Sequence, residues 1–122
     1  MKIRILGNSV RFRLTRSEVQ TLCTQGYVKN QTIFEDNVFG YAIRLVEDSE
    51  RLSAQFLDNT ITLNLPQSLG SNWHRTERVG FSETIDFKQN GCLSLLLEKD
   101  FVCLDERQED QSDNYPNPKA LL

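Results

Sequence analysis

The first fourteen residues alternate between apolar and charged side chains on either side of a turn signal, Gly7-Asn8. A two-residue turn at this pair places Ile5 opposite Val10 and gathers the apolar side chains of both arms on one face. A hairpin with one apolar face must bury that face against another element. Strands joined by hairpins also argue against a parallel βαβ fold. The segment therefore predicts the start of an antiparallel sheet over a hydrophobic core.

The other face of this hairpin carries four cations in two directly opposed pairs, Lys2 with Arg13 and Arg4 with Arg11. Like charges opposite one another in a sheet destabilise it by about 0.2–1 kcal/mol per pair, so a nearby anion is expected. One source is the chain itself, because residues 98–113 hold seven acidic residues and two cations. The other source is a phosphate-bearing ligand, which suits the guanidinium fork. A plain solvated surface is the third alternative.

A short α-helix is predicted directly after this hairpin. Thr15 as N-cap and Glu18 three residues later form a capping box. Val19 and Leu22 supply an apolar stripe at helical spacing, and Gly26 provides the C-terminal stop. These signals limit the helix to about three turns.

A turn at Glu35-Asp36-Asn37 separates predicted strands over residues 27–34 and 39–45. Two further hairpins follow from turn signals. Asp58-Asn59 predicts a two-residue turn that places Phe56 opposite Ile61. The last hairpin is expected to turn on a three-residue loop that ends with Gly91 in the left-handed conformation. Between these hairpins, Pro66 at a first helical position suggests one or two helical turns.

The register chosen for the last hairpin predicts an inward-facing charged pair. It places Glu83 opposite Leu97 and Phe81 opposite Lys99, so that an acid and a base lie diagonally on an otherwise apolar face. Burial would perturb both pKa values, as an acid–base site requires. A bulge in the strand or a salt bridge at the sheet margin explains the same pattern without chemistry.

Together these signals predict an α+β domain, mainly an antiparallel β-meander of about eight strands that forms a sandwich or a partly open barrel. One short α-helix follows the first hairpin, and a helical turn is expected near residues 66–73. With 122 residues, 39% of them hydrophobic, the chain has room for one core. We expect a single globular domain over residues 1–104, with an acidic, proline-containing tail over residues 105–122 packed on it.

Charge and hydropathy restrict the partners. A net charge of −3 disfavours nucleic acid, and no aromatic side chain is interleaved with the cations to stack on bases. Neither an apolar run long enough for a membrane span nor a secretory signal is visible. The sequence thus predicts a cytoplasmic location, no membrane partner, and either an anionic ligand or a protein as partner.

No common enzyme signature occurs, whether for a phosphate-binding loop, a dinucleotide site, a zinc protease or a serine hydrolase. No catalytic residue, cofactor or metal is therefore predicted. His74, the only histidine, is expected in an exposed loop. Cys23, Cys92 and Cys103 lack C-x-x-C spacing and are expected to be reduced and buried.

An acidic cluster near the C-terminus could collect a divalent cation, but it lacks the regular spacing of a calcium loop. A solvated acidic tail explains it better. The cluster comprises Asp105, Glu106, Glu109, Asp110 and Asp113.

Both ends of the chain resemble the ends of a small family of uncharacterised bacterial proteins. The start carries Lys2-Ile3-Arg4, Gly7-Asn8-Ser9, Arg11, Arg13-Leu14-Thr15 and Ser17-Glu18-Val19, and the end carries Glu98-Lys99-Asp100-Phe101, Cys103-Leu104, Glu109-Asp110, Ser112-Asp113 and Tyr115-Pro116-Asn117-Pro118. The resemblance spans nearly the whole chain and implies a stand-alone cytoplasmic domain of unknown function, without site residues. We therefore predict a non-enzymatic binding or regulatory domain. The alternative is an anion-binding protein or small enzyme that uses Lys2, Arg4, Arg11 and Arg13.

Overall fold

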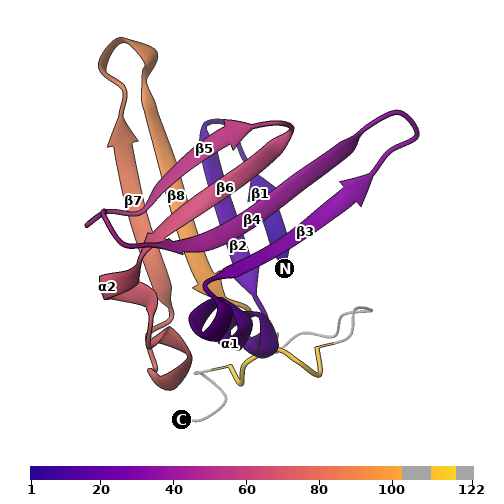
Figure 1. Ribbon diagram of the computed structural model, residues 1–122, viewed down its shortest axis with the longest axis vertical. Helices are drawn as coiled ribbons and strands as arrows, with labels where there is room; N and C mark the ends of the chain where they lie inside the picture. Colours follow the sequence, from indigo (N-terminus) through magenta and orange to yellow (C-terminus); the bar gives the residue numbers. More distant parts are fainter. Residues whose placement is uncertain (103–110, 118–122) are drawn as a thin grey trace.

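The computed structural model describes residues 1–102 and 111–117, which form two four-stranded β-sheets with short helices at one end (Figure 1). In chain order the elements are β1 (Lys2–Ile5), β2 (Ser9–Leu14), α1 (Arg16–Gln25), β3 (Tyr27–Ile33), β4 (Val38–Val46), β5 (Ser53–Leu57), β6 (Thr60–Pro66), α2 (Gln67–Gly70), η1 (Trp73–Arg75), β7 (Gly80–Asp86), η2 (Lys88–Asn90) and β8 (Cys92–Lys99). The predicted α+β class, the eight strands and the helical turns near residues 66–73 are confirmed within these residues.

Each sheet consists of two hairpins joined side by side. The first sheet has the order β1-β2-β8-β7 and the second β3-β4-β6-β5. The outer pairs are antiparallel, whereas the central pairs, β2 with β8 and β4 with β6, are parallel. The sheets are therefore mixed, the strand order is not that of a simple meander, and no closed barrel forms. The central pairs join strands far apart in the sequence, for which no turn signal exists.

Two of the predicted hairpin registers are confirmed. Strand β1 pairs with β2 so that Lys2 faces Arg13 and Arg4 faces Arg11. In the β5–β6 hairpin Phe56 faces Ile61. Its turn residues, Asp58 and Asn59, both have positive φ, as a type I′ turn requires.

The predicted register of the β7–β8 hairpin is wrong by two residues. Phe81 lies opposite Leu97, and Glu83 lies opposite Leu95. The loop is longer than predicted and contains η2, while Gly91 has φ 82° and ψ −163°, outside the left-handed helical region. A shift by two residues leaves every side chain on its own face, so the apolar alternation fitted both registers equally well.

The core lies between the two sheets, whose strands cross obliquely in Figure 1. Helix α1 closes one end and buries Val19 and Leu22. Its predicted capping box is present: the Thr15 side chain accepts from the Glu18 backbone, and the Glu18 carboxylate accepts from the Thr15 N–H. Trp73 of η1 is 1% exposed, and its Nε1 donates to the Arg78 carbonyl over 2.8 Å. This end of the molecule is thus well packed.

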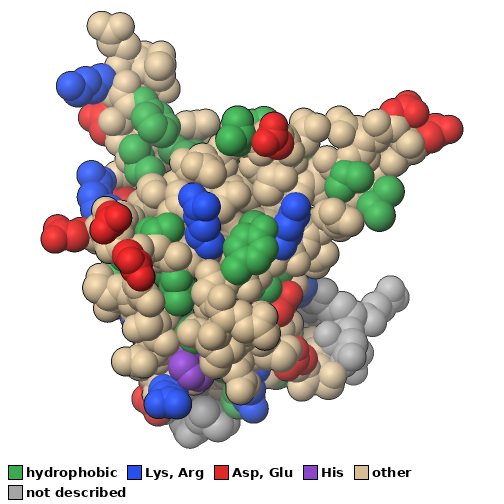
Figure 2. Space-filling model, viewed as in Figure 1, with side chains coloured by type: hydrophobic (Ala, Val, Ile, Leu, Met, Phe, Trp, Pro, Cys, Tyr) green, Lys and Arg blue, Asp and Glu red, His purple; other side chains and the backbone are tan. Residues whose placement is uncertain are grey.

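Apolar side chains are exposed at the hairpin tips, and Figure 2 shows some of them on the face of the second sheet. They include Ile33 and Phe34 on the β3–β4 hairpin, and Phe56 and Leu57 on the β5–β6 hairpin. In the described part of the chain no helix is long and apolar enough to cross a membrane.

Candidate anion-binding site

The outward face of the β1–β2 hairpin carries Lys2, Arg4, Arg11 and Arg13, which we call the basic face. Their register is the predicted one, with two cations directly opposite two others. The alternation of the strands directs the apolar neighbours to the core, where Phe12 is fully buried. The core thereby determines that all four cations share the outward face.

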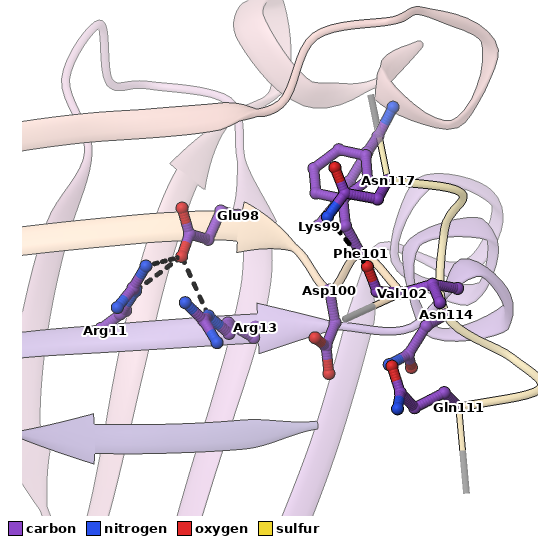
Figure 3. A pocket seen from close by; sticks show the side chains of 10 residues that line it. All are labelled: Arg11, Arg13, Glu98, Lys99, Asp100, Phe101, Val102, Gln111, Asn114 and Asn117. Carbon is purple, nitrogen blue, oxygen red and sulfur yellow. Dashed lines mark hydrogen bonds and ion pairs between the residues drawn. The ribbon is translucent and has the colours of Figure 1, made fainter. Parts of the chain in front are cut away.

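Glu98 supplies the counter-charge for two of these cations. The parallel pairing of β2 with β8 brings Glu98 beside Arg13. Its Oε1 accepts from Arg11 Nε over 2.5 Å and from Arg13 Nε over 3.0 Å, as Figure 3 shows. The Glu98 side chain is 16% exposed. One carboxylate oxygen therefore orients two guanidinium groups on the surface of the sheet.

Asp100, two residues later on the same side of the chain, supplies a second carboxylate. Its Oδ2 lies 3.1 Å from Lys2 Nζ, and the residue is 5% exposed. Arg4 is exposed and has no ion pair with the residues described. Within residues 1–102 and 111–117, four cations on the basic face thus meet two carboxylates. Among these described residues, no carboxylate pairs with Arg4.

Two adjoining hollows lie beside these residues. One, of about 300 Å³, is lined by the four cations of the basic face together with Ile3. The other, of about 260 Å³, lies between the end of β8 and the C-terminal segment (Figure 3). Arg11 and Arg13 border both hollows, while Gln111, Asn114 and Asn117 line only the second. The first hollow offers the greater excess of cations.

Part of the acidic tail is seen at the start of α1. Asp113 Oδ2 accepts from Ser17 Oγ over 2.5 Å, and the Asp113 carbonyl accepts from the Arg16 N–H over 3.1 Å. Hydrogen bonds, chiefly from Ser17 and then from Thr15, lower the pKa of Asp113. Asp105, Glu106, Glu109 and Asp110 lie outside the described residues, so packing of the whole tail on the basic face stays a prediction.

The structure gives Glu83 and Lys99 separate partners. Glu83 is half-buried and forms an ion pair with Arg51 over 3.0 Å, and the hydrogen bond from Arg51 is the main cause that lowers the pKa of this carboxyl. Lys99 points inward and is 5% exposed, and its Nζ donates to the Thr76 carbonyl over 2.7 Å. No ion pair joins the two residues among those described, and the partner of Glu83 is a cation from the β4–β5 loop.

Expectations for His74 and the cysteines need correction. His74 is half-buried in η1, and its Nδ1 is buried without a hydrogen-bond partner among the residues described. Cys23 is half-buried and Cys92 exposed, both as free thiols. Cys92 is the first residue of β8 and follows the loop that contains η2, at the end of the sheet and away from the core. Cys103 lies outside the described residues.

Tyr115 anchors the C-terminal segment against the end of the sandwich. Its ring lies 5.7 Å from that of Phe101, and its N–H donates to the Asp100 carbonyl over 2.8 Å. Burial raises the pKa of Tyr115 to about 12, and the nearby Arg16 opposes this less strongly. The aromatic side chain in the tail therefore packs against its own domain.

Removal of the Tyr115 hydroxyl is expected to change the alkaline stability. The folded chain holds this proton up to a pKa of about 12, against 10.0 for an ordinary phenol. The stability that the buried, protonated Tyr115 hydroxyl contributes is therefore complete below pH 10 and is lost as the pH rises to 12. Urea unfolding across this range should show the free energy of unfolding falling more steeply for the wild type than for Tyr115→Phe. Parallel curves would contradict the assignment, since Tyr27 and Tyr41 are common to both proteins.

In the described part of the chain no group of three or more His, Cys, Asp or Glu side chains is close enough to hold a metal ion. What the geometry defines is a small α+β domain with a partly neutralised basic face. The chain belongs to a family of unknown function, DUF7009, whose model matches residues 1–119. The predicted membership of a family of unknown function is thus confirmed. Comparison with curated proteins and with solved structures gives no match.

Proposed function

We propose that this protein is a non-enzymatic binding domain whose basic face binds a phosphate-bearing anion. The observation that carries this proposal is the hollow of about 300 Å³ lined by Lys2, Arg4, Arg11 and Arg13. Opposed cations on a sheet repel one another, and in the described part of the chain two carboxylates, Glu98 and Asp100, stand against four cations. A bound anion would relieve this repulsion.

The orientation of the guanidinium groups supports a phosphate ligand. Glu98 holds Arg11 through Nε and Nη2 and Arg13 through Nε, and each guanidinium group has further N–H donors. Fixed guanidinium groups lose less conformational entropy when they bind phosphate oxygens. The described residues that line the hollow include no aromatic side chain to stack on a base. These features favour a phosphorylated small molecule over nucleic acid.

The cytoplasm is the compartment that we propose for this domain. Glutathione and thioredoxin keep thiols reduced there, and Cys23 and Cys92 are both free. Phosphorylated small molecules are abundant in the same compartment, which is consistent with the proposed ligand.

The replacement Arg4→Ala tests the proposal. Inorganic phosphate or ATP at low ionic strength should raise the melting temperature of the wild type, since a ligand at ~100 times its Kd stabilises a protein by about 2.7 kcal/mol. The variant should lose most of this increase. Its melting temperature without ligand should stay nearly unchanged, because Arg4 is exposed and has no ion pair with the described residues.

The matched control is Arg75→Ala, which removes an exposed cation from η1. It should keep the full phosphate effect, and added sodium chloride should weaken that effect in both proteins. If phosphate stabilises Arg4→Ala as strongly as the wild type, or stabilises neither, the basic face is not an anion site. That result would favour a protein as the partner of the domain.

A further inference from the structure

A further cavity, of about 390 Å³, lies on the other side of β8 from the basic face. Glu98 and Lys99 are neighbours on one strand and therefore point to opposite faces. Lys99 lines the cavity together with His74, Glu77, Val79, Phe101 and Tyr115. This cavity is separate from both hollows beside the basic face and shares only Lys99 and Phe101 with one of them.

Lys99 brings a buried positive charge to the cavity, and no carboxylate of the described residues forms an ion pair with it. Its Nζ makes one hydrogen bond, to the Thr76 carbonyl, and lies 5.7 Å from the centre of the Trp73 ring and 5.0 Å from that of Tyr115. No ion pair of Lys99 occurs within residues 1–102 and 111–117. An ammonium group has three N–H donors. Among the described residues, the ammonium group of Lys99 therefore has N–H donors available for a ligand.

Desolvation lowers the pKa of Lys99, and electrostatic interactions with Cys23 and Glu77 oppose this shift less strongly. A buried charge without a counter-ion is costly to the folded state. A methionine of similar length would fill the same space without that cost. Residues that weaken the fold in this way are typical of binding and catalytic sites.

His74 supplies a second unused polar atom. Its Nδ1 is buried and has no hydrogen-bond partner among the described residues, and the residue lines the same cavity as Lys99. A buried polar atom without a partner is rare in folded proteins and calls for an explanation. His74 therefore adds an unsatisfied polar group to the lining of the cavity.

We propose that this cavity binds a small monocarboxylate with an apolar or aromatic body. The carboxylate would accept a hydrogen bond from Lys99 Nζ and place a counter-charge directly beside it, in a cavity that His74 also lines. The body of the ligand would pack on Val79, Phe101 and Tyr115. The volume lies within the usual range for a small-molecule site.

Glu77 defines the selectivity of this site. Its carboxylate is exposed at the lining of the cavity and repels additional negative charge. A phosphate dianion or a dicarboxylate is therefore disfavoured, and the basic face is the better site for such ligands. The two sites thus differ in ligand class, so the failure of one proposal leaves the other intact.

Trp73, the only tryptophan of the chain, provides the assay. Its ring lies next to Lys99 Nζ, so a ligand at the ammonium should change the intrinsic fluorescence. The probes are acetate, butyrate, hexanoate, phenylacetate and 3-phenylpropionate, with phenylacetamide as the uncharged partner of phenylacetate. We expect affinity to rise with apolar size, and phenylacetate to bind at least about tenfold more tightly than phenylacetamide, because one charge-assisted hydrogen bond contributes about that factor.

Two variants separate ligand binding from structure. Lys99→Met should remain folded and lose the preference for phenylacetate over phenylacetamide. Lys88→Met, which removes an exposed lysine from η2, should keep it, and so should Arg4→Ala on the basic face. The proposal is overturned if Lys99→Met keeps the preference, if acid and amide bind equally, or if no monocarboxylate binds at up to about 10 mM, where a millimolar site would be mostly occupied.

Discussion

Replacement of Gly80 with alanine is expected to destabilise the protein by about 3 kcal/mol, the upper range for overpacking of a well-packed interior. A Cβ atom at this position would lie 2.1 Å from the Leu97 carbonyl oxygen and 2.9 Å from the Glu98 Cα. Both neighbours are backbone atoms of β8, so no change of rotamer relieves the clash. Strand β7 would have to separate from β8, the strand that carries Glu98 and Lys99.

Urea unfolding followed by Trp73 fluorescence would measure this loss. The matched control is Ser82→Ala, an exposed position two residues along the same face of β7, where the change should stay within about 0.5 kcal/mol. A Gly80→Ala protein as stable as the wild type would show that β7 and β8 do not approach one another as closely as described.

Replacement of Glu98 with glutamine is expected to cost about 2 kcal/mol of stability, between the values for exposed and for buried ion pairs. The change keeps the size of the side chain but removes the negative charge shared by Arg11 and Arg13. The two pairs of opposed cations then repel one another with less compensation. Phosphate or sodium chloride should therefore stabilise the variant more than the wild type.

The free energy of unfolding at low and at high ionic strength is the measurement. Glu50→Gln is the matched control: the same charge is removed from an exposed residue in the β4–β5 loop, and little change is expected. If Glu98→Gln behaves like Glu50→Gln at both ionic strengths, Glu98 does not compensate the basic face. An increased affinity of Glu98→Gln for phosphate would further support the proposed function.

The sequence predicted local geometry well wherever a turn residue identified the register. Gly7-Asn8 and Asp58-Asn59 each allowed one short loop, so the hairpin pattern was enough to assign the opposed cations of the basic face. The β7–β8 hairpin shows the limit of this reasoning. Its loop allowed two lengths, and the period-two pattern did not distinguish them.

The partners of the predicted site residues could not be derived in this way. Strand alternation alone puts Glu98 and Asp100 on the face opposite Lys99. This face lies beside Arg11 and Arg13 because β2 pairs with β8 in parallel. The two strands are more than eighty residues apart in the sequence. The ion pair between Glu83 and Arg51 also depends on tertiary structure, because it links a strand of one sheet to a loop of the other.

By itself the sequence determined the elements, the capping box of α1, the cations of the basic face and the eight strands, because these depend on backbone conformation and on neighbours close along the chain. The tertiary structure alone decided which hairpins lie side by side, which carboxylates meet the cations, and that Lys99 and His74 share one cavity. Those contacts join distant segments, and they form because both sheets must bury their apolar faces in a single core.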